Sequence, residues 1–430
     1  QEAMSLSGFL DTLRERGFIE QTTDEAALEK LFSDGGESVS AYIGFDPSSS
    51  SLHVGSLVPI MALVHLQRCG HRPIALVGGG TGRVGDPSGK TELRKMLGED
   101  SVDENLLGIS NQLSRYLELS EAGSEAGSEA DSQNAGFAVD NAEWLLGLNY
   151  VDFLRDIGRH FSVNRMLSAE SVKLRIDSES GLSFLEFNYS ILQAYDFLVL
   201  NQRYGCQVQM GGSDQWGNIV AGIDLIRRVD GKQAYGITFP LITTASGAKM
   251  GKTEAGAVWL DAERTSPYDY YQFWINTDDR DVSRFLRLFT LLPVEEIEKL
   301  EALEGANIRQ AKQRLALEAT ALNHGQEAAE QAAEAARALF SKEGGGGESV
   351  PTHQVSAADL EGGIAVIQLF NDCGLCDSKG AARRLARQGG LYVNDEKAEE
   401  DRVLTSADLD NECIMLRAGK KKHRRIEVSS

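Results

Sequence analysis

The chain has few of the features that mark secreted or membrane proteins. Five cysteines among 430 residues are too few for a disulfide framework and favour a reducing compartment. No apolar run reaches the roughly 18 residues that a membrane helix needs. The first twenty residues show no basic segment followed by an apolar core, so no secretory signal is expected there. We therefore expect a cytoplasmic protein, or one of an organellar matrix or stroma if the source is eukaryotic.

Basic residues are also scarce. Lys and Arg number 43 against 64 Asp and Glu, which gives a formal net charge of −21. From residue 352 onward 12 basic residues face 13 acidic ones, so almost all of the negative charge lies in the first 351 residues. Contacts with nucleic-acid phosphates need basic surface. Any such contact is therefore expected near the C-terminal end.

The cysteines do not complete a metal motif. Cys373 and Cys376 form a CxxC pair, but no second pair or histidine cluster accompanies it. We interpret them as two thiols in a helix–loop segment, and Cys69 and Cys206 as packing residues. No tightly bound metal is expected.

The first part of the chain reads as a βαβ unit. Residues 39–45 and 73–77 are strand-like apolar runs, and residues 57–66 between them form an amphipathic helix that ends before Gly70. Such a unit begins a doubly wound parallel sheet, so the fold class is α/β. A chain of this length exceeds one ordinary core, and we expect two to four domains.

Further along, composition separates the remaining segments. The tandem SEAG repeat in residues 120–131 is too polar and small to bury, which predicts a surface loop. Residues 151–167 and 184–200 are expected to be helical. A second helical region begins at residue 265 and ends with residues 326–340.

Two glycine motifs around residue 85 suggest other nucleotide-binding proteins. Gly80, Gly82 and Gly85 fit G-x-G-x-x-G, the fingerprint of nicotinamide dehydrogenases, but an earlier βα unit already offers a helix start suited to phosphate. The stretch from Gly85 to Thr91 resembles a P-loop, yet it has three residues between its glycines where that loop needs four. We expect neither protein class, although both motifs indicate a tight backbone near an anionic ligand.

Three short stretches, in order, carry the chemistry: His53-Val54-Gly55-Ser56, residues 211–218 (GGSDQWGN), and Lys249-Met250-Gly251-Lys252-Thr253. A histidine and glycine at a helix start, with two lysines far downstream, suit an ATP that is gripped by its phosphates and cleaved at the α-phosphorus. On these motifs the chain resembles the bacterial and organellar tyrosyl-tRNA synthetases, of the class I group with HIGH and KMSKS motifs. The resemblance runs from about residue 38 to residue 428.

The resemblance implies a reaction and a domain order. The enzyme would activate L-tyrosine with ATP and Mg²⁺, releasing pyrophosphate, and pass tyrosine to the 3′ end of tRNA(Tyr), working as a homodimer. It implies a Rossmann-like catalytic domain, an α-helical domain and a small S4-like α+β RNA-binding domain, whose basic helix and Gly-Gly turn match residues 378–394. The expected boundaries are 1–240 for the catalytic domain with a dimer-interface insertion at about 140–200, 241–265 for the KMSKS-type loop and connection, 266–340 for the helical tRNA-binding domain, 341–351 for a Gly-rich linker and 352–430 for the S4-like domain.

The resemblance also assigns roles to residues. The expected catalytic residues, which contact the phosphates, are His53, Lys249, Lys252, Thr253, Lys90, Arg94 and Ser48. The expected ATP-binding residues are Gly44, Asp46, His53, Gly55, Ser56, Gly212, Asp214, Met250 and Lys252. The expected tyrosine-binding residues are Tyr42, Asp86, Tyr189, Gln193, Asp196, Gln209 and Gln215.

Two of these assignments have a physical argument of their own. Ser56 stands where the family usually has histidine; a serine hydroxyl can donate but is shorter and never cationic, so we expect retained activity with altered ATP handling. Tyr189, Gln193 and Asp196 follow the i, i+4, i+7 spacing of one helix face. A buried polar stripe of this kind is costly unless a ligand satisfies it.

Two other functions remain open from the sequence. A tryptophanyl-tRNA synthetase shares the motifs, but the Tyr42 and Asp196 pair and the S4-like module do not belong to that family. An RNA-binding protein that has lost catalysis is the second alternative. The presence of Lys249, Lys252, Asp86 and Asp196 argues against it.

Overall fold

The computed structural model describes residues 8–33, 37–47, 49–87, 99–120, 134–177, 181–253, 256–340, 351–394, 396–410, 413–419 and 422–429. The SEAG repeat beyond Ser120 and residues 341–350 of the Gly-rich linker lie outside this range. The chain divides into two compact units. The first contains residues 1–251, 259–261 and 283–301, and the second contains residues 252–258, 262–282 and 302–430.

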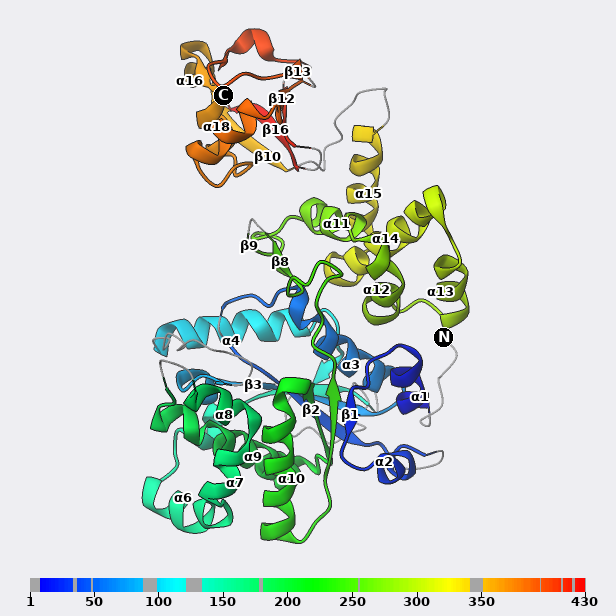
Figure 1. Ribbon diagram of the computed structural model, residues 1–430, viewed down its shortest axis with the longest axis vertical. Helices are drawn as coiled ribbons and strands as arrows, with labels where there is room; N and C mark the ends of the chain where they lie inside the picture. Colours follow the sequence, from blue (N-terminus) through cyan, green and yellow to red (C-terminus); the bar gives the residue numbers. More distant parts are fainter. Residues whose placement is uncertain are drawn as a thin grey trace. The chain divides into compact units, whose positions relative to one another are not determined.

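The first unit is built on a seven-stranded sheet of the expected α/β class (Figure 1). Its neighbouring strands are parallel except at one edge, where β1 runs antiparallel to β7. In spatial order the strands are β1 (Gln21–Thr22), β7 (Tyr235–Phe239), β6 (Val208–Gly212), β2 (Ser40–Phe45), β3 (Arg72–Val77), β5 (Gly136–Asp140) and β4 (Leu119–Ser120).

The predicted βαβ unit is confirmed. Strands β2 and β3 pair in parallel with Ile43 opposite Ala75, and both consist mainly of buried residues. The connecting helix α3 (Leu57–Arg68) is buried along most of its length, because it is apolar on nearly every side. Gly70 follows it with φ of 84°, a conformation that favours glycine.

Two long helices, α9 (Phe184–Tyr204) and α10 (Trp216–Asp230), pack side by side. Ser183 and Glu186 form a capping box that fixes the start of α9. The two helices approach closely at Gly222, where an added Cβ would lie 3.0 Å from the ring of Phe197. This contact holds α10 against the helix that carries the polar stripe.

The prediction of one helix over residues 151–167 is wrong in one respect, because the helix is interrupted. The chain forms α6 (Tyr150–Asp156), a single 3₁₀ turn over Gly158–His160, and then α7 (Val163–Ser168). Phe161 between them is extended and packs against the core of the first unit. Glycine weakens the helix at 158, and burial of the Phe161 ring offsets the lost helical hydrogen bonds. A short helix α8 (Glu170–Ile176) follows, and its buried Arg175 donates to Glu186 of α9 at 2.7 Å.

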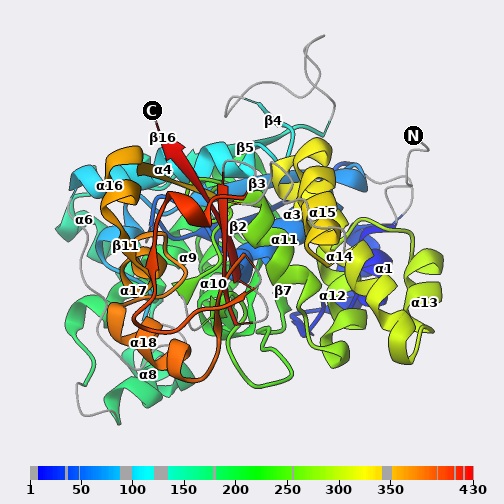
Figure 2. The same ribbon diagram turned by 90° about the horizontal axis from the view of Figure 1, so that it is seen from above.

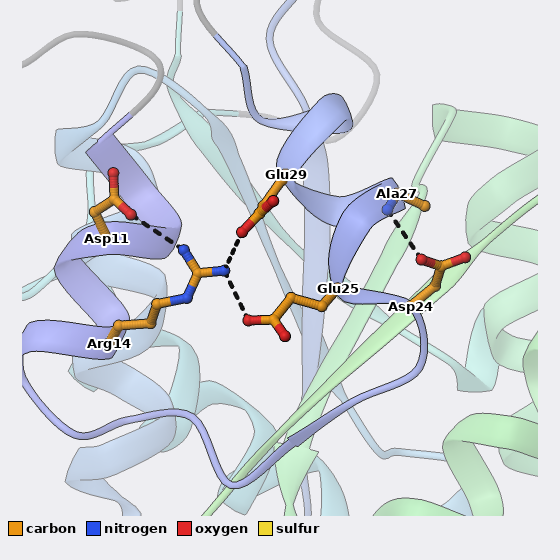
Figure 3. A network of polar contacts seen from close by, with 6 residues as sticks. All are labelled: Asp11, Arg14, Asp24, Glu25, Ala27 and Glu29. Carbon is orange, nitrogen blue, oxygen red and sulfur yellow. Dashed lines mark hydrogen bonds and ion pairs between the residues drawn. The ribbon is translucent and has the colours of Figure 1, made fainter.

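The N-terminal helices are joined to the unit by polar contacts. In Figure 3 the guanidinium of Arg14, on α1 (Gly8–Glu15), contacts Asp11 and reaches Glu25 and Glu29 of α2 (Glu25–Leu31). These charges are exposed, so each pair contributes little alone. The buried guanidinium of Arg16 donates to the carbonyl oxygens of Arg287 and Thr290, which ties α1 to the end of α12 (Val282–Phe289).

The second unit contains a helical part and a small sheet. Helix α11 (Pro267–Ile275) packs on α14 (Ile308–His324) and α15 (Gln326–Phe340). The sheet has five strands, and its long strand β16 is drawn in red in Figure 2. In spatial order they are β10 (Thr352–Ser356), β16 (Lys422–Ser429), β15 (Cys413–Ala418), β12 (Leu391–Val393) and β13 (Glu396–Lys397).

The basic segment predicted for RNA contact is helical, as expected. It forms α18 (Lys379–Arg387), capped by the Ser378 side chain and followed by Gly389 with φ of 69°. The remaining helices and strands are α4 (Glu99–Leu113), α5 (Ala142–Leu145), α13 (Val294–Glu301), α16 (Ala357–Gly362), α17 (Val366–Asp372), β8 (Lys252–Thr253), β9 (Gly256–Ala257), β11 (Ile364–Ala365) and β14 (Val403–Leu404). Among the described residues no helix is long and apolar enough to cross a membrane.

The tight pairing of β3 and β5 gives a test of the sheet. A Cβ on Gly136 would lie 2.5 Å from the carbonyl oxygen of Pro73, and a backbone atom cannot move aside without shifting a strand. We expect Gly136→Ala to destabilise the protein by about 1–3 kcal/mol, measured by chemical denaturation. Gly147→Ala is the matched control, because no atom lies within 4 Å of its added Cβ. Equal stability of the two variants would contradict the described register.

Candidate functional site

A cavity of about 190 Å³ opens at the carboxyl ends of β2 and β6. Ligands of parallel α/β sheets bind at this edge. Three residues of the expected nucleotide set line it, namely Gly44, Asp46 and Gly212. All seven residues of the expected amino-acid pocket line it as well: Tyr42, Asp86, Tyr189, Gln193, Asp196, Gln209 and Gln215.

Asp196 is the most buried charged group of the cavity, with only 1% of its surface exposed. Two donors hold its carboxyl group: Asn141 Nδ2 lies 2.9 Å from Oδ2, and Trp144 Nε1 lies 2.8 Å from Oδ1. Burial nevertheless outweighs these donors and raises the pKa of Asp196 to about 7. The carboxyl group therefore has its orientation fixed and changes its charge near neutral pH.

The sequence analysis missed Asn141 and Trp144. Asn141 directly follows β5, and Trp144 lies on α5 one turn later. They are 55 and 52 residues away from Asp196 along the chain, so no local pattern links them. The available signal was their place after a parallel strand, where polar side chains gather at the ligand-binding edge.

The backbone of the glycine loop that follows β3 donates hydrogen bonds to Asp140 and Asn141. The backbone N–H of Gly79 donates to Asp140 at 2.9 Å, and that of Gly80 donates to Asn141 Oδ1 at 2.8 Å. A Cβ at Gly79 would lie 2.3 Å from the Asp140 carboxylate. The tight backbone expected near an anion is therefore present, but the anion that it contacts is the chain's own Asp140. Asn141 Oδ1 is thereby occupied, which directs its amide nitrogen to Asp196.

Two buried polar atoms of the cavity wall have no hydrogen-bond partner within the described part of the chain. They are the hydroxyl oxygen of Tyr42 and Oε1 of Gln209. Burial, and secondly the nearby Asp196, raise the pKa of Tyr42 well above its usual value, so its hydroxyl stays protonated. A buried polar atom without a partner is costly, which indicates that a polar ligand completes this end of the cavity.

The other end of the cavity is polar and half-buried. Gln215 Nε2 donates to Asp86 Oδ2 at 2.7 Å. Behind it, Asn218 Nδ2 donates to the side-chain oxygens of Gln193 and Gln215, at 3.0 and 3.3 Å. Asn218 is the last residue of the second motif, but the sequence analysis assigned no role to it.

The first and third motifs meet a short distance away. His53 Nδ1 accepts from the backbone N–H of Gly55 at 3.0 Å, and the His53 ring contacts the edge of Trp259. A Cβ on Gly55 would lie 3.0 Å from the carbonyl oxygen of Met250. Gly251 has φ of 80°, and its added Cβ would lie 3.0 Å from the Gly55 nitrogen. The backbone of the other motif thus limits the space at both glycines, and at Gly55 the His53 ring, 2.6 Å from the added Cβ, limits it further.

The structure does not bring every expected residue to the cavity. Lys249 is exposed and its backbone forms a β-bridge with Thr243. Ser56 lies half-buried at the start of α3, and Asp214 lies against Gly212. Lys252 and Thr253 form β8, but their side chains are outside the description, and so are the residues Ser48, Lys90 and Arg94.

The part of the chain that the structure describes shows no metal centre. Among the described residues there is no group of three His, Cys, Asp or Glu side chains that could hold an ion. Cys373 and Cys376 are buried, and burial raises the pKa of both thiols, that of Cys373 to about 11. They are protonated at neutral pH and belong to the core under the small sheet.

Comparison with known proteins identifies the family. A family model described as tRNA synthetases class I (W and Y) matches residues 34–341, and one described as Tyrosine--tRNA ligase SYY-like C-terminal domain matches residues 345–426. A tyrosine--tRNA ligase of Desulfatibacillum aliphaticivorans is 57% identical over 98% of both chains. One of Rhodospirillum rubrum is 53% identical over 98% of both. The chain belongs to the tyrosyl-tRNA synthetases.

This membership settles the reaction. The enzyme activates L-tyrosine with ATP and transfers tyrosine to tRNA(Tyr), so the tryptophan-specific and non-catalytic alternatives are set aside. A solved tyrosyl-tRNA synthetase from Aspergillus nidulans mitochondria is 32% identical and superposes with a TM-score of 0.68, covering 77% of this chain and 94% of that one. A tryptophanyl-tRNA synthetase from Encephalitozoon cuniculi, 14% identical with a TM-score of 0.53, shares the fold.

The two donors to Asp196 give a pH-dependent test. Trp144→Phe removes a donor that stabilises the carboxylate, so the pKa of Asp196 should rise above about 7. The resemblance implies that Asp196 accepts a hydrogen bond from the phenol of tyrosine, and a carboxylate accepts such a hydrogen better than a protonated carboxyl group does. Tyrosine use would then require the ionised form of Asp196. We expect the acid limb of kcat/KM for tyrosine to move to higher pH, with kcat/KM lower by about tenfold at pH 7.

The measurement is pyrophosphate exchange from pH 6 to 9. Trp274→Phe, at a buried tryptophan of α11, is the control and should leave the profile in place. A Trp144→Phe profile that superimposes on the wild type would show that this indole does not set the charge of Asp196.

Proposed function

We propose that L-tyrosine binds in the 190 Å³ cavity with its phenol hydroxyl between Asp196 and Tyr42. The observation that carries this proposal is a buried carboxyl group, fixed by two donors, in the same cavity as a hydroxyl without a described protein partner. A hydroxyl ligand would satisfy both. A site built in this way rejects an analogue that lacks the hydroxyl, because its polar groups are then left unpaired.

The α-ammonium group would lie at the half-buried end. Asp86, Tyr189 and the side-chain oxygen of Gln193 offer a carboxylate and two further acceptors there. Gln215 would lie near the substrate carboxylate or the ribose, and Gln209 completes the wall. In this arrangement the amino acid spans the cavity from Asp196 to Asp86.

ATP would bind at the adjacent glycines, Gly44, Gly55 and Gly212, with Asp46 and Asp214 close to the ribose and Ser56 and Met250 beside the nucleotide. Because His53 Nδ1 accepts from Gly55, the ring proton is on Nε2, which can donate to a phosphate oxygen. The tyrosine carboxylate oxygen then bonds to the α-phosphorus as the bond to the bridging oxygen of pyrophosphate breaks. No covalent enzyme intermediate is needed.

The leaving pyrophosphate needs cations. In our proposal Lys249, Lys252 and Thr253 hold it on one side, and Lys90, Arg94 and Ser48 on the other, by contacts that strengthen in the transition state. Mg²⁺ would travel with the ATP phosphates, its usual ligands, since the described residues offer no protein cluster for it. These steps would take place in the cytoplasm, as the bacterial relatives suggest.

The tRNA would be held by the C-terminal domains, for which we keep the boundaries 266–340 and 352–430. Lys379, Arg383, Arg384 and Arg387 are exposed on α18, which gives the S4-like domain a basic face suited to phosphates. The first 351 residues carry most of the negative charge. This charge separation would favour contact of tRNA with the basic end.

We also propose that the enzyme is a homodimer through the insertion at about 140–200. The insertion and the start of α9 carry a group of exposed large apolar side chains, and exposed apolar patches mark protein interfaces. This group comprises Leu146, Tyr150, Val151, Leu154, Val163, Leu167, Leu174, Ile176, Phe184 and Leu185.

The tyrosine site is tested by pyrophosphate–ATP exchange with tyrosine, phenylalanine and tryptophan offered separately. We expect wild-type exchange with tyrosine alone. Asp196→Ala leaves Asn141 and Trp144 as buried donors with nothing to bind, so tyrosine-dependent exchange should fall by at least about a hundredfold. Asp156→Ala, at an exposed carboxylate of α6, is the control. Unchanged discrimination against phenylalanine in Asp196→Ala would remove Asp196 from the pocket.

The dimer is tested at Phe184, which is 71% exposed. Phe184→Glu places a charge in the proposed interface and should produce monomers, measured by analytical ultracentrifugation. Leu107→Glu changes a comparably exposed leucine of α4 outside the insertion, and should not alter the association state. A wild-type protein that sediments as a monomer at micromolar concentration would refute the proposal directly.

A further inference from the structure

Asn218 lies behind the amino-acid cavity. It is on the first turn of α10, only 7% exposed, and it lines a neighbouring cavity of about 230 Å³ between α7 and α10. It is not part of the wall of the 190 Å³ cavity. Any influence of Asn218 on a ligand in that cavity must therefore pass through other side chains.

Those side chains are two glutamines. The Asn218 amide nitrogen has two hydrogens, and it donates to Oε1 of Gln193 at 3.0 Å and to Oε1 of Gln215 at 3.3 Å. The nitrogen of Gln215 in turn donates to Asp86 at 2.7 Å. One amide thus connects both glutamines, and through Gln215 it reaches the carboxylate of Asp86.

The orientation of a glutamine amide decides what it can bind. Rotating the group by half a turn hardly changes its shape, but it exchanges an acceptor for a donor. A reversed Gln215 would place its oxygen against the Asp86 carboxylate, acceptor against acceptor. A reversed Gln193 would present hydrogens where an oxygen now lies, and hydrogens repel an ammonium group. Each amide oxygen has a second lone pair, so donation from Asn218 leaves capacity for a ligand.

We propose that Asn218 is a positioning residue that holds Gln193 and Gln215 with their oxygens as acceptors, and thereby makes the pocket select for an α-ammonium group. The inference rests on the proposed placement of that group at Asp86, Tyr189 and Gln193. It adds a residue that touches neither tyrosine nor ATP. Its effect should therefore depend on the amino group of the ligand.

The test compares three ligands on the full-length enzyme. L-Tyrosine and tyramine carry the amino group, whereas 3-(4-hydroxyphenyl)propionate keeps the phenol and lacks that group. Asn218→Leu removes both donated hydrogen bonds at similar side-chain size. By calorimetry we expect the Kd of tyrosine and tyramine to rise about tenfold and the Kd of the propionate to rise clearly less.

Two further variants keep the result interpretable. Asn218→Ser retains one donor and should give an intermediate loss, and it carries the test if the leucine variant does not fold. Asn201→Leu is the matched control, because Asn201 is a buried amide on α9, 5% exposed, that donates to the Cys206 carbonyl oxygen outside the cavity. It should lower stability without changing the ratio of the three affinities.

Two outcomes overturn the inference. If Asn218→Leu raised the Kd of all three ligands equally, Asn218 would have a general structural role. If it raised none of them, Gln193 and Gln215 would keep their orientation without Asn218. If the wild-type enzyme itself failed to prefer tyramine over the propionate, the proposed placement of the ammonium group would be wrong, and the inference would fail with it. The wild-type measurement thus separates the two failures.

Discussion

The burial of Asp196 is the constraint on which the rest of the site depends. A buried carboxyl group loses the hydration that stabilises its charge, and the pKa of Asp196 accordingly rises to about 7. The fold compensates with Asn141 and Trp144, each donating to one carboxyl oxygen. That requires the end of β5, the glycine loop and α9 to lie together. The glycine loop completes the arrangement, because its N–H groups occupy Asp140 and Asn141 and so direct the Asn141 amide.

Much of the fold and of the cavity wall could be predicted from the sequence, because the patterns that indicate them lie within short stretches of the chain. The apolar runs of β2 and β3 and the buried helix between them follow from hydrophobic patterning. The spacing of Tyr189, Gln193 and Asp196 predicted one polar helix face, and all three line one cavity. Gly70 and Gly389 mark helix ends as expected, both with positive φ.

The residues that were missed act over long separations or through packing. Asn141 and Trp144 have ordinary roles within their own segment, a strand end and a short helix, and acquire their function from a helix more than fifty residues later. The interruption of the helix at Gly158 depends on the packing of the Phe161 ring against the core of the first unit. The spacing of apolar residues along the sequence does not show that packing. Gly55 was assigned to ATP, yet it also makes room for the backbone of Met250, and Gly251, to which no role was assigned, makes room for the backbone nitrogen of Gly55. A single glycine can thus serve both the expected approach of ATP and the packing of two backbone segments.

In the proposed binding mode the two ends of the tyrosine cavity differ in burial and in the kind of contact they make with the ligand. The difference follows from the chemistry of tyrosine. A phenol is neutral, so its end can be closed and dry, and a single desolvated carboxyl group with fixed orientation distinguishes it from phenylalanine. The ammonium group is charged and lies beside the carboxylate that attacks ATP, so that end must remain open to the nucleotide. Asp86 is accordingly only half-buried. Where water screens charge, selectivity cannot rest on one carboxylate alone, and acceptors of fixed orientation become necessary. The amides of Gln193 and Gln215 meet that need only while a group behind them, Asn218, keeps them from turning.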